Sequence, residues 1–429
     1  MKIAVVGAGY VGLTTASVLA SWGHVVKLVE KDAQRRTQLE QGEVPFFEPG
    51  LAELVRRQLK TPAASGEASL QIFSSLEPVL SAVELTFLCV GTPSRPDGRA
   101  NLEQVFAVAA QVGKKRRSEH LLVIKSTVPP GTARQVADLY PQRVASNPEF
   151  LREGSALADT LHPERIVLGV DRVEDAEILR RLYAPTGSPI LVTDPTSAEL
   201  IKYASNAFLA TKISFINSIA NLCEKLGADV TRVAQGMGLD SRIGPAFLGA
   251  GIGYGGSCFP KDTLALEKLA RQVGYNFRLL QATRLTNLEQ RLLVIRKLEK
   301  ELGPLAGKKI ALWGLAFKAN TDDLRQAPAL TITRHLRRKG AQVVAYDPVV
   351  AKKPLSGKGP GPVLVADPYA ATAGAQALVI VTDWPEFSHL DLERVYWSMA
   401  ANPVLIDGRN LLDPARARAI GFRYHGIGR

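Results

Sequence analysis

The first thirty residues follow the order that a strand, a turn, a helix and a second strand require. Residues 2–6 and 25–29 are short apolar runs, and residues 13–21 between them contain few helix breakers. Short apolar runs bounded by turn residues are typical of strands buried in a parallel sheet. The start of the chain therefore predicts a strand–helix–strand unit. A secretory signal is an alternative interpretation of this start, but cleavage would remove the first strand.

The turn after the first strand reads Gly-Ala-Gly-Tyr-Val-Gly, with glycines at Gly7, Gly9 and Gly12. In dinucleotide-binding folds, the first glycine makes the turn, the second lets the backbone approach a pyrophosphate, and the third lets the helix pack on the strand. The pattern predicts a dinucleotide site here.

An acidic residue, Glu30, follows the second strand. An acid at this position accepts hydrogen bonds from the adenosine ribose hydroxyls, which favours NAD over a 2′-phosphorylated cofactor. The basic residues Lys31 and Arg35 nearby make this preference less sharp.

Three more apolar runs predict further parallel strands, at residues 85–90, 121–125 and 143–146. Thr92, Thr127 and Glu149 follow these runs, and the carboxyl ends of such strands are where doubly wound sheets bind ligands. We therefore expect the three side chains at the binding edge of the sheet. Cys89 lies within a run and is interpreted as a core residue.

Residues 198–226 predict one long helix that connects two domains. Lys202 and Asn206 are four residues apart and so share a face. Apolar neighbours, including Phe208 and Phe215, predict that Lys202 is buried, which favours a functional ammonium over a solvated one. Cys223 near the end of the helix is interpreted as packing.

The most unusual stretch is residues 251–266, where four glycines precede Cys258. Pro260 suits the first turn of a helix, so the thiol lies just before a helix N-terminus. The helix dipole and Lys261 favour the nucleophilic thiolate. The alternative is a glycine-rich turn that contains a small buried residue.

From residue 308 the order of elements repeats, because 309–314 resembles 2–7, 340–347 resembles 23–30, and 377–382 resembles 85–90. The repeat lacks the full glycine pattern, so we expect it to bind a nucleotide-linked substrate. The predicted fold is α/β, with two Rossmann-like doubly wound domains joined by a long central helix. The expected domains are residues 1–195, 196–295 and 300–429. Residues 351–362 predict a surface loop.

Composition narrows the function classes. The chain has 429 residues and a formal charge of +12, and this positive charge suits an anionic partner. The basic run at 114–117 has no interleaved aromatic residues, so it does not predict a nucleic-acid site. Three widely spaced cysteines predict no disulfide framework and favour the cytoplasm. The six histidines are scattered, so we expect no metal. No segment predicts a membrane span.

Taken together, several motifs in order resemble the UDP-glucose/GDP-mannose dehydrogenase family over nearly the whole chain. They are Gly-Ala-Gly-Tyr-Val-Gly at 7–12, Lys-Ser-Thr-Val at 125–128, Asn-Pro-Glu-Phe-Leu-Arg-Glu-Gly at 147–154, Asn-Ala-Phe-Leu-Ala at 206–210, Gly-Tyr-Gly-Gly-Ser-Cys-Phe-Pro-Lys-Asp at 253–262 and Gly-Leu-Ala-Phe-Lys at 314–318. The chain departs from the family at Glu30, where Asp is more usual, and at Ala319 and Gln326, where Pro and Glu are more usual.

The resemblance implies a four-electron oxidation of a sugar alcohol to a carboxylate with two NAD+. It implies that Cys258 is the nucleophile, that Lys202 and Asn206 stabilise the oxyanion, and that Glu149 is the general base. It further implies that Asp262 positions or activates water and that Thr127 lies near the nicotinamide.

The resemblance also implies binding residues. Those for NAD are Gly7, Gly9, Tyr10, Val11, Gly12, Glu30, Arg35, Thr92, Thr127, Glu153, Lys261 and Arg325. Those for the sugar nucleotide are Glu149, Phe150, Leu151, Arg152, Glu153, Lys202, Asn206, Arg242, Phe247, Leu248, Gly249, Ala250, Gly251, Gly255 and Lys318. Arg242 resembles an arginine donated across a dimer interface, which implies a homodimer with a helical dimerisation region.

The substrate that the resemblance implies is UDP-glucose, with GDP-mannose or a UDP-N-acetylhexosamine as alternatives for the same chemistry. A two-electron hydroxyacid dehydrogenase would have a similar fold and would not need Cys258. A non-catalytic NAD-binding sensor would bind the cofactor without turning over a sugar nucleotide.

Overall fold

The computed structural model describes residues 1–429 except 64–65, 67–68, 115–118, 141 and 351–360. The predictions for Lys115, Arg116 and Arg117 and for most of the 351–362 loop fall outside the described residues. The described chain divides into two compact units. One comprises residues 1–205 and 264–269, and the other comprises residues 206–263 and 270–429.

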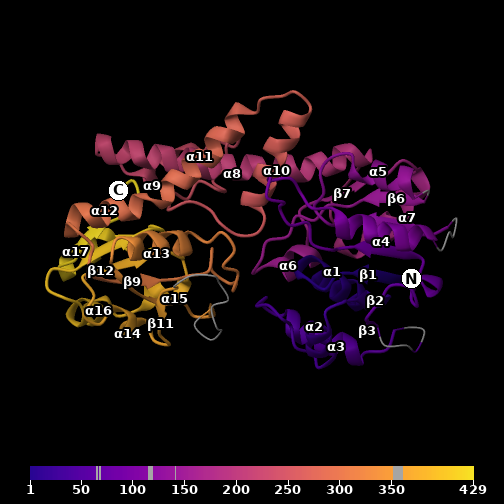
Figure 1. Ribbon diagram of the computed structural model, residues 1–429, viewed down its shortest axis with the longest axis horizontal. Helices are drawn as coiled ribbons and strands as arrows, with labels where there is room; N and C mark the ends of the chain where they lie inside the picture. The colour runs from indigo at the N-terminus through magenta and orange to yellow at the C-terminus, as the bar shows by residue number, and fades with distance from the viewer. Residues whose placement is uncertain (64–65, 67–68, 115–118, 141, 351–360) are drawn as a thin grey trace. The chain divides into compact units, whose positions relative to one another are not determined.

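The first unit contains an eight-stranded sheet in the order β3-β2-β1-β4-β5-β6-β7-β8 (Figure 1). Its neighbouring strands run parallel except for β6 and β7. The strands are β1 (Lys2–Val6), β2 (Val25–Val29), β3 (Leu70–Phe73), β4 (Leu85–Leu88), β5 (Leu121–Ile124), β6 (Arg143–Ser146), β7 (Ile166–Gly169) and β8 (Ile190–Thr193). The helices are α1 (Tyr10–Ser21), α2 (Ala33–Glu40), α3 (Leu51–Lys60), α4 (Glu103–Lys114), α5 (Thr132–Leu139), α6 (Ala156–Leu161) and α7 (Val173–Tyr183).

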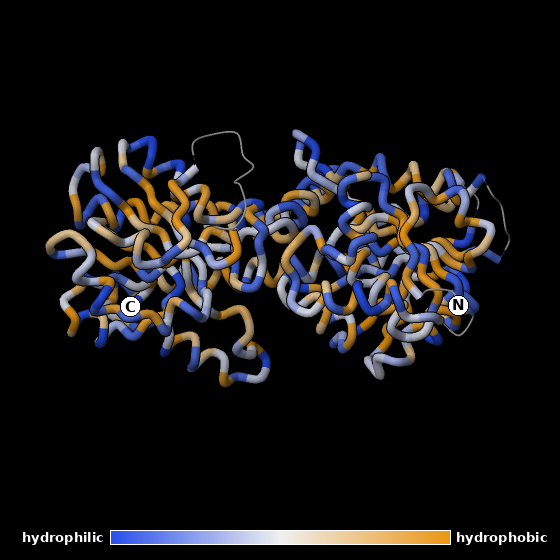
Figure 2. The backbone as a smooth tube through the Cα atoms, turned by 90° about the horizontal axis from the view of Figure 1, so that it is seen from below, coloured by the Kyte–Doolittle hydropathy of each residue, from blue (hydrophilic) through white to orange (hydrophobic). Residues whose placement is uncertain are grey.

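Both faces of this sheet are buried, which explains why its strands are continuous apolar runs. Ile3 and Val5 pack into one hydrophobic cluster and Ala4 and Val6 into another, because successive strand residues point to opposite faces. Helices α1, α3 and α7 contribute to the first cluster, and α4 and α5 to the second. Apolar segments of the chain appear orange along the tube in Figure 2.

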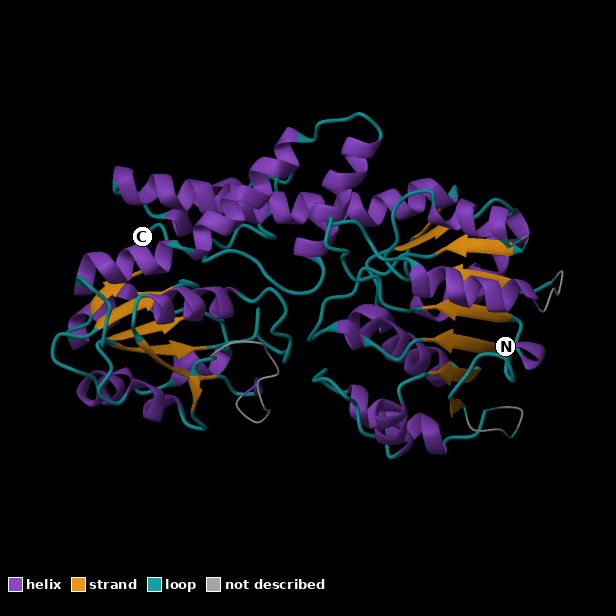
Figure 3. Cartoon of the chain, viewed as in Figure 1, coloured by secondary structure: helices purple, strands orange, loops and turns teal. Residues whose placement is uncertain are grey.

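The second unit contains a six-stranded parallel sheet in the order β11-β10-β9-β12-β13-β14 (Figure 3). This order confirms the second doubly wound domain that the repeat predicted. Its strands are β9 (Lys309–Trp313), β10 (Gln342–Tyr346), β11 (Val363–Leu364), β12 (Ala377–Ile380), β13 (Val404–Asp407) and β14 (Arg423–His425). Its helices are α13 (Pro328–Arg338), α14 (Pro368–Thr372), α15 (Pro385–His389), α16 (Leu392–Ser398) and α17 (Pro414–Ile420).

The predicted long helix is α8 (Pro195–Leu226), which joins the two domains. It is followed by α9 (Val230–Gly238), α10 (Phe259–Gln272), α11 (Arg278–Arg291) and α12 (Leu293–Leu302). The C-terminal half of α8 contributes Ile216, Ala220 and Cys223 to the core of the second unit. Cys223 and Cys89 are both buried, as predicted. Among the described residues, no helix has both the length and the apolar character needed to cross a bilayer.

The third glycine of the turn after β1 is required by packing. A Cβ on Gly12 would lie 1.8 Å from the Gly7 carbonyl oxygen, and Gly7 itself has φ +99°. A Cβ on Gly9 would meet no atom within 4 Å. Gly7 and Gly12 therefore form the turn and the helix contact, whereas Gly9 leaves open space beside its backbone.

These two glycines give a matched test of this packing. We expect Gly12→Ala to destabilise the protein by roughly 2–3 kcal/mol, because the overpacked turn must shift. Gly9→Ala should cost no more than about 1 kcal/mol, because Gly9 is the N-cap of α1 and its Cβ meets nothing. Thermal unfolding of the two variants tests the difference, and equal losses of stability would contradict the packing argument.

Candidate active site

The carboxyl edge of the first sheet contains a buried ion pair. Glu149 follows β6, and its Oε1 lies 3.1 Å from Nζ of Lys202 on α8. The other carboxylate oxygen, Oε2, accepts a 2.6 Å hydrogen bond from the backbone N–H of Leu151. Both side chains are buried, with 4% of Lys202 and 6% of Glu149 exposed. Burial keeps these charges close together and away from water, so each orients the other.

Phe150 lies beneath two cations at this site. The Lys202 ammonium is 5.4 Å from the centre of its ring, and the Arg165 guanidinium is 4.0 Å from it. These cation–π contacts fix the ring next to the ion pair. The prediction that Lys202 is buried is confirmed, but part of its basis was wrong: Phe208 and Phe215 are 66% and 50% exposed.

The ends of β4 and β5 are tied together beside this cluster. The Thr92 hydroxyl donates to the Thr127 carbonyl oxygen at 2.8 Å, and the Ser126 hydroxyl donates to the Val90 carbonyl oxygen at 2.7 Å. Parallel strand order therefore brings Thr92 and Thr127 to one edge.

The residues around the glycine turn fit a dinucleotide. The buried Glu30 carboxylate follows β2, accepts from Ala8 N–H at 3.1 Å and from Asp32 N–H at 2.9 Å, and lies 3.4 Å from Arg35. Open space beside the Gly9 backbone allows a pyrophosphate to approach. The Tyr10 ring stacks on Phe46 with centroids 3.9 Å apart.

In the second unit, Cys258 immediately precedes α10, where the sequence predicted it. The thiol is partly exposed, and the Ser257 hydroxyl oxygen lies 3.5 Å from its sulfur. The Cys258 carbonyl accepts the first helical hydrogen bond, from Asp262 N–H at 2.8 Å. The α10 N-terminus therefore directs its unpaired N–H groups toward the residue that carries the thiol.

Asp262 connects two of the predicted residues. Its Oδ2 accepts from Asn206 Nδ2 at 2.7 Å, and its Oδ1 accepts from Lys261 Nζ at 2.6 Å. Only 1% of Asp262 is exposed. Asn206 lies one helical turn after Lys202 on α8, so the donors of the two residues occupy one face of a single helix.

The loop after β9 packs on the glycines that precede Cys258. Gly256 N–H donates to the Arg325 carbonyl oxygen at 2.9 Å. A Cβ on Gly255 would lie 2.5 Å from the Gln326 carbonyl oxygen, and one on Gly256 would lie 2.8 Å from the Phe317 ring. Gln326 has the unusual φ of +54° at this contact. The Lys318 ammonium lies 5.7 Å from the Phe317 ring.

Sequence reasoning missed Arg409, which follows β13. Its Nε donates to the Val381 carbonyl at 2.8 Å, Nη1 to that of Gly253 at 3.3 Å, and Nη2 to that of Phe317 at 3.4 Å. Burial lowers the pKa of this guanidinium, although Asp383 and Asp407 oppose the shift. A basic residue at the carboxyl end of a strand was the signal that could have found it.

The other residues predicted to bind the sugar nucleotide or NAD each make their own local contacts. Arg242 is exposed and paired with Asp240, and Phe247 has φ +65° with its ring 6.2 Å from that of Phe259. Residues with other local roles are Arg152, paired with Asp159; Glu153, partly exposed; Leu248, buried; Gly249, exposed; Ala250, packed on the core; and Gly251, whose N–H donates to Asn217.

Two doubly wound sheets and a glycine-rich dinucleotide turn are typical of nucleotide-dependent oxidoreductases. The sequence matches three domains of one family: the UDP-glucose/GDP-mannose dehydrogenase family NAD binding domain over residues 1–187, its central domain over 196–289, and its UDP binding domain over 311–414. The chain belongs to this family, and its cofactor is NAD.

Individual relatives match over the whole chain. The chain is 45% identical to UDP-glucose 6-dehydrogenase of Pseudomonas aeruginosa, with 100% of this chain and 98% of that protein covered. It is 44% identical to the UDP-glucose 6-dehydrogenase TuaD of Bacillus subtilis, with 100% and 93% covered. The structure of a UDP-glucose dehydrogenase from Pyrobaculum islandicum superposes with a TM-score of 0.91 at 40% identity, with 100% and 97% covered. The structure of UDP-D-ManNAc dehydrogenase from Pyrococcus horikoshii superposes with a TM-score of 0.87 at 28% sequence identity, with 100% of this chain and 99% of that chain covered.

Glu199 supports the start of α8 one turn before Lys202. Its carboxylate accepts hydrogen bonds from Gly131 N–H at 2.6 Å and Ala133 N–H at 2.7 Å, at the N-terminus of α5. Burial raises its pKa to about 7, and the hydrogen bonds from Ala133 and Gly131 only partly oppose this shift. The carboxyl group thus links α8 to the loop that follows Thr127.

This raised pKa predicts a pH dependence of stability. Between pH 4.5 and about 7 the folded state keeps a proton that the unfolded state has released, so stability falls as pH rises. The fall attributable to Glu199 is at most about 3 kcal/mol. In Glu199→Gln this contribution disappears, so its thermal midpoint should decline less than that of the unsubstituted protein over this range. Parallel declines would contradict the shift.

Proposed function

We propose that this protein oxidises the C6 alcohol of UDP-glucose to a carboxylate, consuming two NAD+ and one water and releasing UDP-glucuronate, two NADH and three protons. The named relatives and the UDP binding domain support the substrate. The observation that carries the chemistry is the partly exposed thiol of Cys258 at the N-terminus of α10.

Two oxidations occur at one carbon. NAD+, when bound, accepts one hydride in each of them. In the first, the alcohol loses a hydride and a proton and becomes an aldehyde. The Cys258 thiolate then forms a C–S bond to the aldehyde carbon, and the carbonyl oxygen becomes an oxyanion. The Lys202 ammonium and the second N–H of the Asn206 amide are donors for this oxygen, and fixed donors of this kind stabilise developing charge.

Hydrolysis completes the reaction. Loss of the second hydride from the carbon converts the thiohemiacetal into a thioester. Glu149 takes a proton from the attacking water, the C–S bond breaks, and the thiolate of Cys258 is restored. The buried Asp262 carboxylate accepts from both Asn206 and Lys261, which suits it to orient these donors and the water. This proposal includes three predicted contacts: Thr127 with the nicotinamide, Arg325 with NAD and Lys318 with the sugar nucleotide.

NADH yield tests the proposed function. With excess NAD+, we expect two NADH per UDP-glucose and none from GDP-mannose or UDP-N-acetylglucosamine. A yield of one NADH per UDP-glucose would indicate a two-electron alcohol dehydrogenase. Two NADH from another sugar nucleotide would identify that compound as the substrate. No NADH from any of them would favour an NAD-binding sensor.

Cysteine variants test the covalent route. Cys258→Ser should reduce release of UDP-glucuronate by at least roughly 10³-fold, because the hydroxyl is a far weaker nucleophile than a thiolate. Cys223→Ala is the control, since that thiol is buried in the core of the second unit. Normal acid release by Cys258→Ser would refute the route.

We also propose a homodimer formed through α8. We propose the reducing cytoplasm as its location, because three widely spaced cysteines are typical of a reducing compartment. Phe208, Phe215 and Leu222 are 66%, 50% and 49% exposed, and their seven-residue spacing aligns them along one side of the helix. Leu285 and Leu288 on α11 are also more than half exposed. Exposed apolar side chains in such a row suit a second copy of the chain.

Light scattering after size-exclusion chromatography tests this interface. The unsubstituted chain should have twice the 46.3 kDa mass of one copy, and the double variant Phe208→Glu, Phe215→Glu should shift to a single copy because charges would be buried. Val173→Glu, which changes a 74% exposed apolar residue on α7, should not change the mass. A dimeric double variant would contradict the proposed interface.

A further inference from the structure

The main chain that leads to Cys258 is held by side chains of α11. The Asn287 amide binds both main-chain polar groups of Tyr254: its Oδ1 accepts from Tyr254 N–H at 2.8 Å, and its Nδ2 donates to the Tyr254 carbonyl at 3.2 Å. Asn287 is 4% exposed. Gly253 must lack a side chain here, because its Cβ would lie 2.6 Å from Asn287 Oδ1.

Arg291, one turn further along α11, binds the same carbonyl. Its Nη2 donates to the Tyr254 carbonyl oxygen at 2.6 Å, and its Nη1 lies 3.4 Å from the Thr331 hydroxyl. Arg291 is 3% exposed, and burial lowers its pKa. Within the described part of the chain, no carboxylate lies within ion-pair distance of it. Burying a guanidinium in this way is costly, so its attachment to Tyr254 requires an explanation.

Tyr254 links these α11 side chains to the helix that begins after the thiol. Its ring meets the Phe259 ring edge-on, with centroids 5.7 Å apart at 86°. Phe259 is the first residue of α10 and directly follows Cys258. The main chain of Tyr254 is thus held by α11, and its ring contacts Phe259, the residue that follows Cys258.

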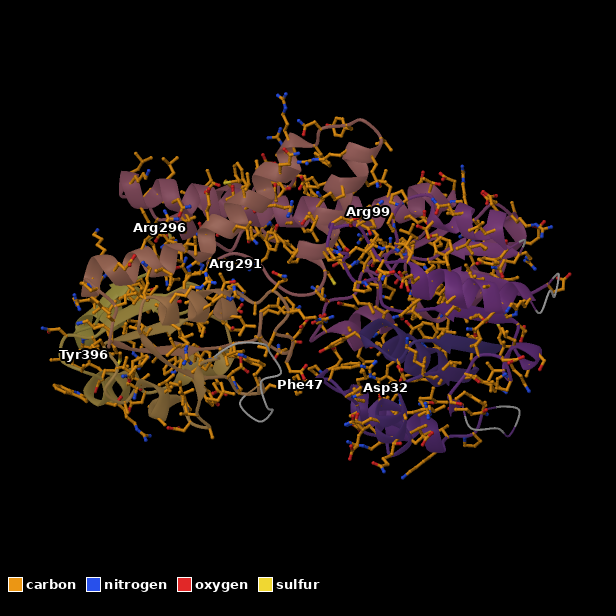
Figure 4. All side chains as sticks on the ribbon, viewed as in Figure 1. Asp32, Phe47, Arg99, Arg291, Arg296 and Tyr396 are labelled. Carbon is orange, nitrogen blue, oxygen red and sulfur yellow. The ribbon has the colours of Figure 1, made fainter. Side chains whose placement is uncertain are left out.

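Two further buried amides hold the start of the same loop. Asn217 Oδ1 accepts from Gly251 N–H at 2.8 Å, and Gln290 Nε2 donates to the Gly251 carbonyl at 2.8 Å. Both are almost fully buried. The loop is therefore anchored at Gly251 and Tyr254 by neutral amides, and Arg291, which is labelled in Figure 4, adds a charged donor from α11.

We propose that Asn287 and Arg291, together the Tyr254 clamp, are positioning residues that fix the Cys258 thiol for attack on the aldehyde. This inference rests on the proposed function. The clamp holds the main chain of Tyr254, whose ring packs on Phe259, so it acts through these two residues. Loosening it affects the step that needs Cys258 and leaves the first alcohol oxidation in place.

The test compares Arg291→Met and Arg291→Lys with the control Arg296→Met. Arg296 is exposed on α12 and also donates to a main-chain carbonyl, that of Glu289 at 3.3 Å. We expect kcat to fall roughly 100-fold in Arg291→Met and roughly 10-fold in Arg291→Lys, which keeps one donor, with the KM for UDP-glucose changed less than about threefold. The control should match the unsubstituted protein.

The discriminating readout is the fate of the aldehyde. With hydroxylamine present as a trap, Arg291→Met should yield the oxime of the sugar-nucleotide aldehyde and fewer than two NADH per UDP-glucose consumed. General destabilisation would lower the amount of active protein without changing this ratio. An unchanged ratio in folded Arg291→Met would overturn the proposal. If Arg291→Met does not fold, the ratio in Arg291→Lys decides.

Hydrogen exchange tests the clamp without any substrate. The amides of residues 254–257 should exchange at least fivefold faster in Arg291→Lys than in Arg296→Met, because Tyr254 has lost part of its anchorage. Equal exchange would overturn the clamp. If the unsubstituted protein does not oxidise UDP-glucose, the proposed function fails, and this exchange measurement alone still decides whether Arg291 holds the loop.

Discussion

The constraint on which the candidate site depends is the close packing of a glycine-rich main chain against its surroundings. Three glycines between Gly251 and Cys258 have no room for a Cβ atom. A Cβ there would clash with the Asn287 amide, the Gln326 carbonyl oxygen or the Phe317 ring. The four glycines of this loop lose much conformational freedom on folding and contribute no side-chain packing in return. Its geometry therefore depends on the hydrogen bonds that surrounding side chains make to it.

Those hydrogen bonds come from segments that lie far apart in the sequence. Asn217 is on α8, Asn287 and Arg291 are on α11, and Arg409 follows β13. Each binds a backbone group that would otherwise be buried without a partner, which would cost free energy. The second unit thus uses buried polar groups to define one loop conformation, and this conformation places Cys258 at the beginning of α10.

Two buried carboxylates, one in each unit, bind the cationic and amide side chains predicted for the site. Glu149 holds Lys202 in a buried ion pair, and Asp262 accepts from both Asn206 and Lys261. Buried charges persist only when partners satisfy them, so each carboxylate also fixes the orientation of the donors around it. Helix α8 supplies a donor to each carboxylate, because Lys202 and Asn206 are separated by a single helical turn.

The sequence alone determined the two doubly wound sheets, the long helix and the family, because apolar runs, glycine spacing and motif order are local properties of the chain. It also located Cys258 just before a helix. It did not find Arg409, the Asn206–Asp262 hydrogen bond or the Tyr254 clamp. It also did not show that Phe208 and Phe215, two apolar neighbours used to predict the burial of Lys202, are themselves exposed. Only the tertiary structure decides these features, because burial and polar pairing depend on which distant segments pack together, and no local pattern encodes that choice.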